Sequence, residues 1–251
     1  MLAMTLIPIY WGPWWEPSAA KISYNWQDVN ELMTGVVSGR YMDSLNQYGI
    51  GRGSVATPWV YPVDPPDAGF GDKQLGEVIR TAINESHVPA PFSMEAEQKL
   101  PFYSLIVKPG IEHLRTATPD GKVKDGDPDT GTDGYHFPFT YEWKVELLPR
   151  STWTGQACWI KAGADALSTV QTWAHEMAEA YVSGFGEIAD LCQDKKPVWI
   201  EGVALPQYWS QADNACMPLP DGTLHHADRI KKKQPDFRHA DRITTKQPHM
   251  P

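Results

Sequence analysis

The sequence predicts a single α+β domain in which a mixed, twisted sheet packs against one amphipathic helix and is followed by an irregular C-terminal part. The chain has 251 residues, of which 41% are apolar and 21% charged, so it can bury a substantial core. Its 22 prolines argue against a helical bundle, because proline breaks a helix interior. Short β-rich runs alternate with a few well-bounded helical segments. We expect this domain to cover residues 1–224.

The elements expected before residue 100 begin with a buried strand that Gly12 and Pro13 end. Apolar residues at helical spacing follow Asn25, a capping residue, and Gly39 breaks this helical stretch. The glycine-rich turn at 49–53 is not a phosphate loop, because it lacks the Gly-Lys-Ser/Thr ending. In order, we expect a strand at Leu6–Trp11, helices at Asn25–Gln47 with a second short helix at Tyr41–Tyr48, a strand at Ser54–Val60, a loop at 61–70 and a helix at Lys73–Glu85.

The later elements are three strands and one long helix. Strands are expected at Tyr103–Val107, Phe139–Leu147 and Ala157–Ala162, and a helix at Ala166–Val182. A long loop at 117–134 contains Asp125, Asp127 and Asp129, which partly imitate the alternating oxygen ligands of a Ca²⁺ loop. Its glycine comes one position late, and His136 stands where the final bidentate Glu belongs. A solvated acidic turn is therefore the preferred interpretation.

The helix at 166–182 carries the chemistry. Its apolar face is formed by Val170, Trp173, Ala174, Met177 and Tyr181. On the other side, His175 and Glu179 are four residues apart and stack one turn above the other. An imidazole and a carboxylate so placed can ligate a cation, while Glu176 can hold the bound water and take its proton. The motif is His-Glu-x-x-Glu, a variant of the zinc signature His-Glu-x-x-His; an ordinary polar face with a His–Glu pair is the competing interpretation.

A third metal ligand is expected just after this helix. The glycines at 184 and 186 let the chain turn back, so Glu187 or Asp190 can face the helix. Both alternatives for the third ligand stay open. The metal is expected to be Zn²⁺ or another divalent cation. One histidine with carboxylates is a harder ligand set than three histidines, so an ion other than zinc is also compatible.

Three further groups of residues carry expectations. Cys192 and Cys216 can form a disulfide, which leaves Cys158 as a buried thiol. His136 can be a further ligand or a transition-state donor, but a buried structural histidine is the preferred interpretation. Trp11, Trp14 and Trp15 can serve a glycan or peptide surface, although core packing is favoured because aromatic rings bury so much area.

The His-Glu-x-Ala-Glu segment, Glu187-Ile-Ala-Asp-Leu-Cys192 and Trp209-Ser with Cys216 together resemble the phosphate-induced, EXORDIUM-like proteins and their bacterial and fungal relatives. The resemblance covers about residues 6–217, and only residues 173–192 are specific. It implies a zincin-like fold, with the sheet packed on an active-site helix, and a secreted protein, although residues 1–15 lack the features of a signal peptide. It implies no established reaction.

These observations support two hypotheses. In the first, the protein is a zincin-like metallopeptidase with ligands His175, Glu179 and either Asp190 or Glu187, and Glu176 as general base. In the second, it is a non-catalytic secreted binding or signalling protein whose metal site is structural or lost. The sequence leaves both the substrate and the oligomeric state open. No apolar run is long enough to span a membrane.

Charge is divided unevenly along the chain. The net charge is −9, but residues 225–251 contain seven Lys and Arg against three Asp, which leaves −13 for residues 1–224. So acidic a domain argues against nucleic-acid binding. The tail repeats His226-Ala-Asp-Arg-Ile230 at positions 239–243, and its low apolar content predicts disorder outside the core.

Overall fold

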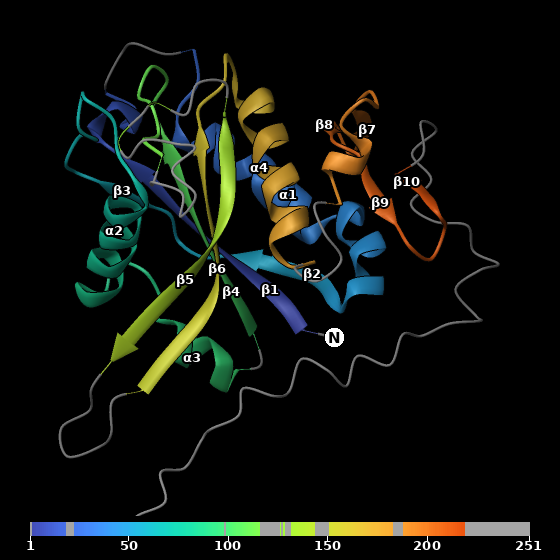
Figure 1. The fold of residues 1–251 in the computed structure, drawn as a ribbon, viewed down its shortest axis with the longest axis horizontal. Coiled ribbons are helices and arrows are strands. Elements are labelled where there is room, and N and C mark those ends of the chain that lie inside the picture. The colour runs from blue at the N-terminus through green and yellow to red at the C-terminus, as the bar shows by residue number, and fades with distance from the viewer. Residues whose placement is uncertain are drawn as a thin grey trace, which may run out of the picture.

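A mostly parallel, twisted sheet of six strands forms the centre of the protein (Figure 1). The computed structural model describes residues 2–18, 23–97, 99–115, 126, 128, 132–143, 151–182 and 188–218. The strands are β1 (Leu2–Trp11), β2 (Ile50–Val55), β3 (Trp59–Tyr61), β4 (Lys99–Val107), β5 (Gly134–Trp143) and β6 (Ser151–Lys161). Their order is β2-β1-β4-β6-β5, with β3 also paired to β1, and only the pairing of β5 with β6 is antiparallel. Among the described residues, β5 is thus an edge strand.

Helices cover both faces of this sheet (Figure 1). The helices are α1 (Trp26–Ser38), α2 (Asp72–Asn84), α3 (Pro91–Ala96) and α4 (Ala166–Ala180), and the 3-10 turns are η1 (Pro13–Trp15), η2 (Arg40–Tyr48) and η3 (Asp190–Cys192). Helices α1 and α4 share one hydrophobic cluster with one face of the sheet, and α2 shares a second cluster with the other face. The two clusters lie on opposite faces because successive side chains of a strand alternate. In β4, Phe102 and Ile106 belong to the first cluster, while Tyr103 and Leu105 belong to the second.

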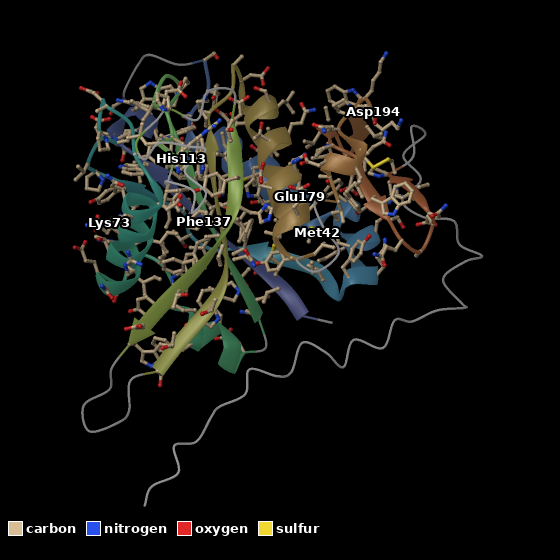
Figure 2. The ribbon with its side chains drawn as sticks, viewed as in Figure 1. Met42, Lys73, His113, Phe137, Glu179 and Asp194 are labelled. Atoms are coloured by element: carbon tan, nitrogen blue, oxygen red, sulfur yellow. A yellow bond between two sulfur atoms is a disulfide. The ribbon has the colours of Figure 1, made fainter. Side chains whose placement is uncertain are left out.

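The C-terminal part contains two small hairpins, the first of which packs beside α4 (Figures 1 and 2). They are formed by β7 (Val198–Ile200) with β8 (Val203–Leu205), and by β9 (Tyr208–Ser210) with β10 (Ala215–Met217). The Tyr208 hydroxyl donates to the Tyr41 carbonyl at 3.1 Å, which ties this part to η2. The disulfide Cys192–Cys216 links η3 to β10. The expected irregular C-terminal part therefore contains small antiparallel sheets.

Most of the expected elements are confirmed, often with different bounds. The helix at 73–85 and the helix at 166–182 are α2 and α4, and the helical stretch from Asn25 is broken at Gly39 as expected. The single strand expected at Ser54–Val60 is wrong, because β2 ends at Val55 and β3 begins at Trp59, and Pro58 between them has no N–H to donate. Helix α3 was not expected from the sequence.

The beginning of β5 corrects a second expectation. The loop expected at 117–134 and the strand expected at 139–147 place His136 in a turn, whereas β5 already starts at Gly134. His136 therefore lies inside a strand and is paired with Cys158 of β6. Residues 144–147 of the expected strand lie outside the described residues.

The structure also tests what the sequence predicts for Cys158, for the N-terminal tryptophans and for membrane spans. Cys158 is free and buried, as expected, and burial raises the pKa of its thiol. Trp11 and Trp15 are core residues, which confirms the packing interpretation for them, whereas Trp14 is only half-buried. Within the described chain, no helix is long and apolar enough to cross a membrane. The tail at 225–251 lies outside the described residues.

Candidate metal centre

Helix α4 carries two buried carboxylates. Asp165 caps the helix by accepting a hydrogen bond from the Ser168 backbone N–H at 2.7 Å. Glu176 and Glu179 are only 7% and 4% exposed, although the sequence pattern places both on the polar side. That side is covered by β5 and by the C-terminal part, which pack against α4. Burying a charged carboxylate costs free energy unless partners compensate it, so the surroundings of these two side chains are informative.

The two oxygens of Glu179 have different partners. Oε1 accepts hydrogen bonds from the backbone N–H groups of Ala189 and Asp190, both at 3.0 Å. Oε2 lies 3.5 Å from Nε2 of His175 and 3.8 Å from Nδ1 of His136. The backbone of the segment after the helix thus fixes one oxygen and directs the other towards two imidazoles. Figure 2 shows Glu179 on the side of α4 that faces the C-terminal part.

The first group of candidate ligands is His175, Glu179 and Asp190. Nε2 of His175 lies 3.2 Å from Oδ1 of Asp190 as well as 3.5 Å from Oε2 of Glu179. All three ligand atoms lie within 4.8 Å of one another. Ligands bound at 2.0–2.2 Å to a tetrahedral ion are separated by about 3.3–3.6 Å. The two separations from His175 are close to this range, so the three residues form a candidate site for one divalent ion.

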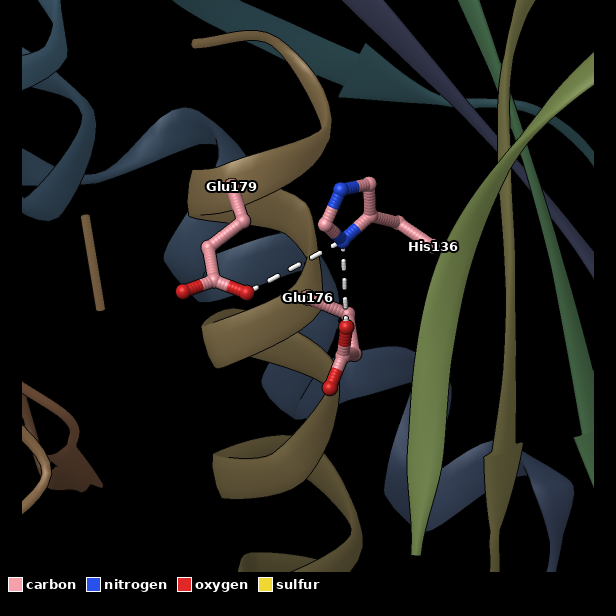
Figure 3. A group of neighbouring side chains, drawn as sticks. All are labelled: His136, Glu176 and Glu179. Atoms are coloured by element: carbon pink, nitrogen blue, oxygen red, sulfur yellow. Dashed lines mark hydrogen bonds and ion pairs between the residues drawn. The ribbon is translucent and has the colours of Figure 1, made fainter. Parts of the chain in front are cut away.

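The second group is His136, Glu176 and Glu179 (Figure 3). His136 reaches from β5 towards α4, where its Nδ1 lies 3.3 Å from Oε2 of Glu176. Glu176 is therefore oriented by an imidazole, and the two groups meet at Oε2 of Glu179. His136 was expected to be buried, but its side chain is 20% exposed and faces two carboxylates; a structural role for it stays a prediction.

Strand β5 is anchored from its opposite face. Tyr135 points away from α4, and its hydroxyl donates to Oδ1 of Asp72 at the start of α2. The same hydroxyl lies 3.2 Å from Nε2 of His113, whose ring stacks on Trp159. Since successive side chains of a strand point to opposite faces, this anchor fixes the position from which His136 faces Glu176.

The structure brings most of the expected site residues together. His175, Glu179 and Asp190 form one group, and Glu176 lies beside it. Glu187, the alternative third ligand, lies outside the described residues, as do Asp125, Asp127 and Asp129 of the expected Ca²⁺ turn. His136 was expected as a further ligand only in the less favoured alternative, because its residue type in the Gly134-Tyr-His sequence does not reveal its neighbours.

Comparison of the chain with protein-family models, with curated proteins and with solved structures finds no match. The resemblance to the phosphate-induced proteins therefore stays a prediction. The fold and the residues of the site are the basis for a functional proposal.

Proposed function

We propose that this protein is a zincin-like metal-dependent hydrolase, a peptidase, whose ion is held by His175, Glu179 and Asp190. The observation that carries the proposal is the orientation of Glu179. Two backbone N–H groups bind its Oε1, while Oε2 and Oδ1 of Asp190 both lie within 3.5 Å of Nε2 of His175. A site whose ligands are held by a second set of hydrogen bonds is typical of metal centres in proteins.

The nitrogen and oxygen donors of this group suit zinc or a harder divalent ion. When bound, the ion would supply a water of lowered pKa and would polarise the carbonyl to be cleaved. Glu176 follows His175 by one residue, about 100° further round the helix. It is the general base in this proposal, because its carboxylate lies beside the ligand group without belonging to it. His136 orients that carboxylate across 3.3 Å.

A peptide substrate is supported by the position of β5. Among the described residues β5 pairs only with β6, so its other side has backbone groups that an extended chain can pair with. His136 lies on this strand and faces the base Glu176. A peptide added along β5 would therefore pass the candidate metal centre.

Secretion is part of the same proposal. The disulfide between Cys192 and Cys216 supports an oxidising compartment, because the cytosol keeps most thiols reduced. It holds η3, the turn that begins with Asp190.

The test begins with metal content. Elemental analysis of purified protein is expected to find one divalent ion per chain, lost in His175→Ala and retained in the control His87→Ala, whose imidazole lies 3.2 Å from Glu85, stacks on Trp59 and belongs to neither group of candidate ligands. The proposed metal site is wrong if the wild-type protein, reconstituted with Zn²⁺, Mn²⁺ and Co²⁺ in turn, holds none at stoichiometry.

The second stage measures hydrolysis of a fluorescently labelled unfolded protein, such as casein. Chelation is expected to abolish cleavage, and Glu176→Gln is expected to abolish it while the ion stays bound. Bound metal without cleavage would favour a non-catalytic protein with a structural ion. Cleavage that survives in Glu176→Gln would contradict the assignment of the base.

A further inference from the structure

A pocket of about 550 Å³ that opens widely onto the surface, called the cavity below, lies at the carboxyl ends of β1, β4 and β6, away from the candidate metal centre. Its wall is formed by Trp14 after β1, by residues 109–110 after β4, by residues 161–164 at the end of β6 and just after it, and by Ser23 and Tyr24 before α1. This volume falls within the range of small-molecule sites in proteins.

The path of the chain makes this a place where ligands are expected. From β1 the chain crosses to β2 through α1 on one face of the sheet, and it returns to β4 through α2 on the other face. The strand order therefore reverses between β1 and β4. In open α/β sheets, crevices beyond the carboxyl ends of the strands at such a reversal are the usual ligand sites.

The cavity is separate from the candidate metal centre. Its wall at 162–164 precedes the first residue of α4, whereas His175 lies nine residues into the helix, about 14 Å along its axis. None of the lining residues belongs to either group of candidate metal ligands. An occupant of this cavity therefore does not depend on the metal.

Two aromatic side chains of the wall are held in place. Trp14 is half-buried and meets the buried Trp15 edge-on, with ring centroids 4.8 Å apart. The Tyr24 hydroxyl donates to the carbonyl of Gly163 at 2.7 Å. An indole that is held in place and partly accessible offers a platform for the C–H face of a saturated sugar ring at little entropic cost.

Lys161, the cation of the wall, already has anionic partners. Nζ of Lys161 lies 3.4 Å from Asp133 and 3.8 Å from Glu112, so its ammonium group already faces two carboxylates. An anionic ligand would have to compete with both carboxylates for this cation. Gly110 has open space where a side chain would stand, so the backbone there can be approached. Such a wall suits hydroxyl groups, which both donate and accept hydrogen bonds.

We propose that this cavity binds a neutral sugar, with one pyranose ring stacked on Trp14 and its hydroxyls bonded to Lys161 and to the backbone at 110. The proposal adds a glycan-binding site to the protein and is independent of the proposed peptidase activity.

Saturation-transfer NMR with glucose, galactose, mannose, N-acetylglucosamine and cellobiose, each at millimolar concentration, tests the proposal. The wild-type protein is expected to bind at least one of these probes, equally with and without chelator. Trp14→Ala is expected to weaken that binding about tenfold or more, as the loss of a central aromatic contact does. Trp14→Phe is expected to keep part of it.

Two further variants complete the test. Trp199→Ala removes a tryptophan that is 65% exposed on β7 and is the matched control, with binding unchanged. Ala164→Arg places a long side chain at the exposed rim of the cavity and is expected to abolish binding without disturbing the core. The proposal is overturned if no probe binds the wild-type protein, if binding survives in Ala164→Arg, or if glucose 6-phosphate binds in preference to glucose.

Discussion

The two groups of candidate ligands share Glu179 but are built from different parts of the molecule. His136 and Glu176 stand on β5 and α4, which are regular elements packed on the central sheet. Asp190 stands on η3, a single 3-10 turn in the C-terminal part. The Glu176 side chain is 10% exposed, whereas that of Asp190 is 52% exposed.

This difference shows two ways of holding a polar side chain in position. We call His136 and Glu176 the sheet half of the site and Asp190 the η3 half. The sheet half is positioned by the hydrophobic core, so folding of the domain puts it in place. The half on η3 is positioned by the N–H groups of residues 189 and 190, which donate to Glu179, and by the disulfide from Cys192 to Cys216. We therefore expect the η3 half to be the easier one to release.

The largest effect is expected from Glu179→Gln, which removes the charge that both halves share. The amide oxygen of Gln can still accept from Ala189 and Asp190, but its NH₂ group cannot ligate a cation. Metal affinity should fall well beyond the about 10–100-fold loss that follows removal of an outer hydrogen-bond partner. Isothermal titration with Zn²⁺ measures this loss, and an unchanged affinity would show that Glu179 is not a ligand.

The next largest effect is expected from the double variant Cys192→Ser/Cys216→Ser, which acts on the η3 half alone. Loss of the cross-link should lower the free energy of unfolding by about 3 kcal/mol. Metal affinity should fall about 10–100-fold, because Asp190 and the two N–H groups lose their anchor. Cys158→Ala, which removes a thiol outside the C-terminal part, is the control for altering a cysteine. Metal affinity equal to that of the wild-type protein would show that the hydrogen bonds alone hold η3.

A smaller effect is expected from His136→Phe, which acts on the sheet half alone. The ion should stay bound, since His175, Glu179 and Asp190 are unchanged, while kcat should fall about 10–100-fold because Glu176 loses the group that orients it. Parallel measurement of metal content and kcat separates these effects. A stoichiometric loss of metal would instead make His136 a ligand.

The smallest effect is expected at Asp165, the N-cap of the helix on which both halves depend. Asp165→Ala should cost about 1 kcal/mol of unfolding free energy. Hydrogen bonds from Ser168 lower the pKa of the Asp165 carboxyl in the folded protein, so the stabilisation is present above its unfolded pKa. It is lost as the pH falls through the lower folded value.

Urea unfolding of Asp165→Ala at neutral pH and at low pH measures this dependence. The difference from the wild-type protein should shrink on acidification. Asp165→Asn keeps a capping oxygen without a titrating group, and its stability should not show this pH dependence. An equal cost of Asp165→Ala at both pH values would show that the ionised carboxylate contributes nothing.

Much of the helix and part of the site were predictable from local sequence. Helical spacing placed Val170, Trp173 and Met177 on the buried face of α4, and the four-residue interval placed His175 and Glu179 on one side. The sequence allowed a disulfide between Cys192 and Cys216 with Cys158 left over, and the structure has this pairing. These features depend on residues close in the chain or on residue types with few partners.

Only the tertiary structure decided how the rest of the site is assembled. His136 reaches Glu176 because β5 lies at the edge of the sheet and pairs with β6, the strand that leads into α4. Local periodicity carries no information about which strands become neighbours. For the same reason the burial of Glu176 and Glu179 was unexpected, since β5 and the C-terminal part, distant in sequence, cover that side of the helix. The helix determined which side chains share a face, and long-range packing determined which partners meet them there.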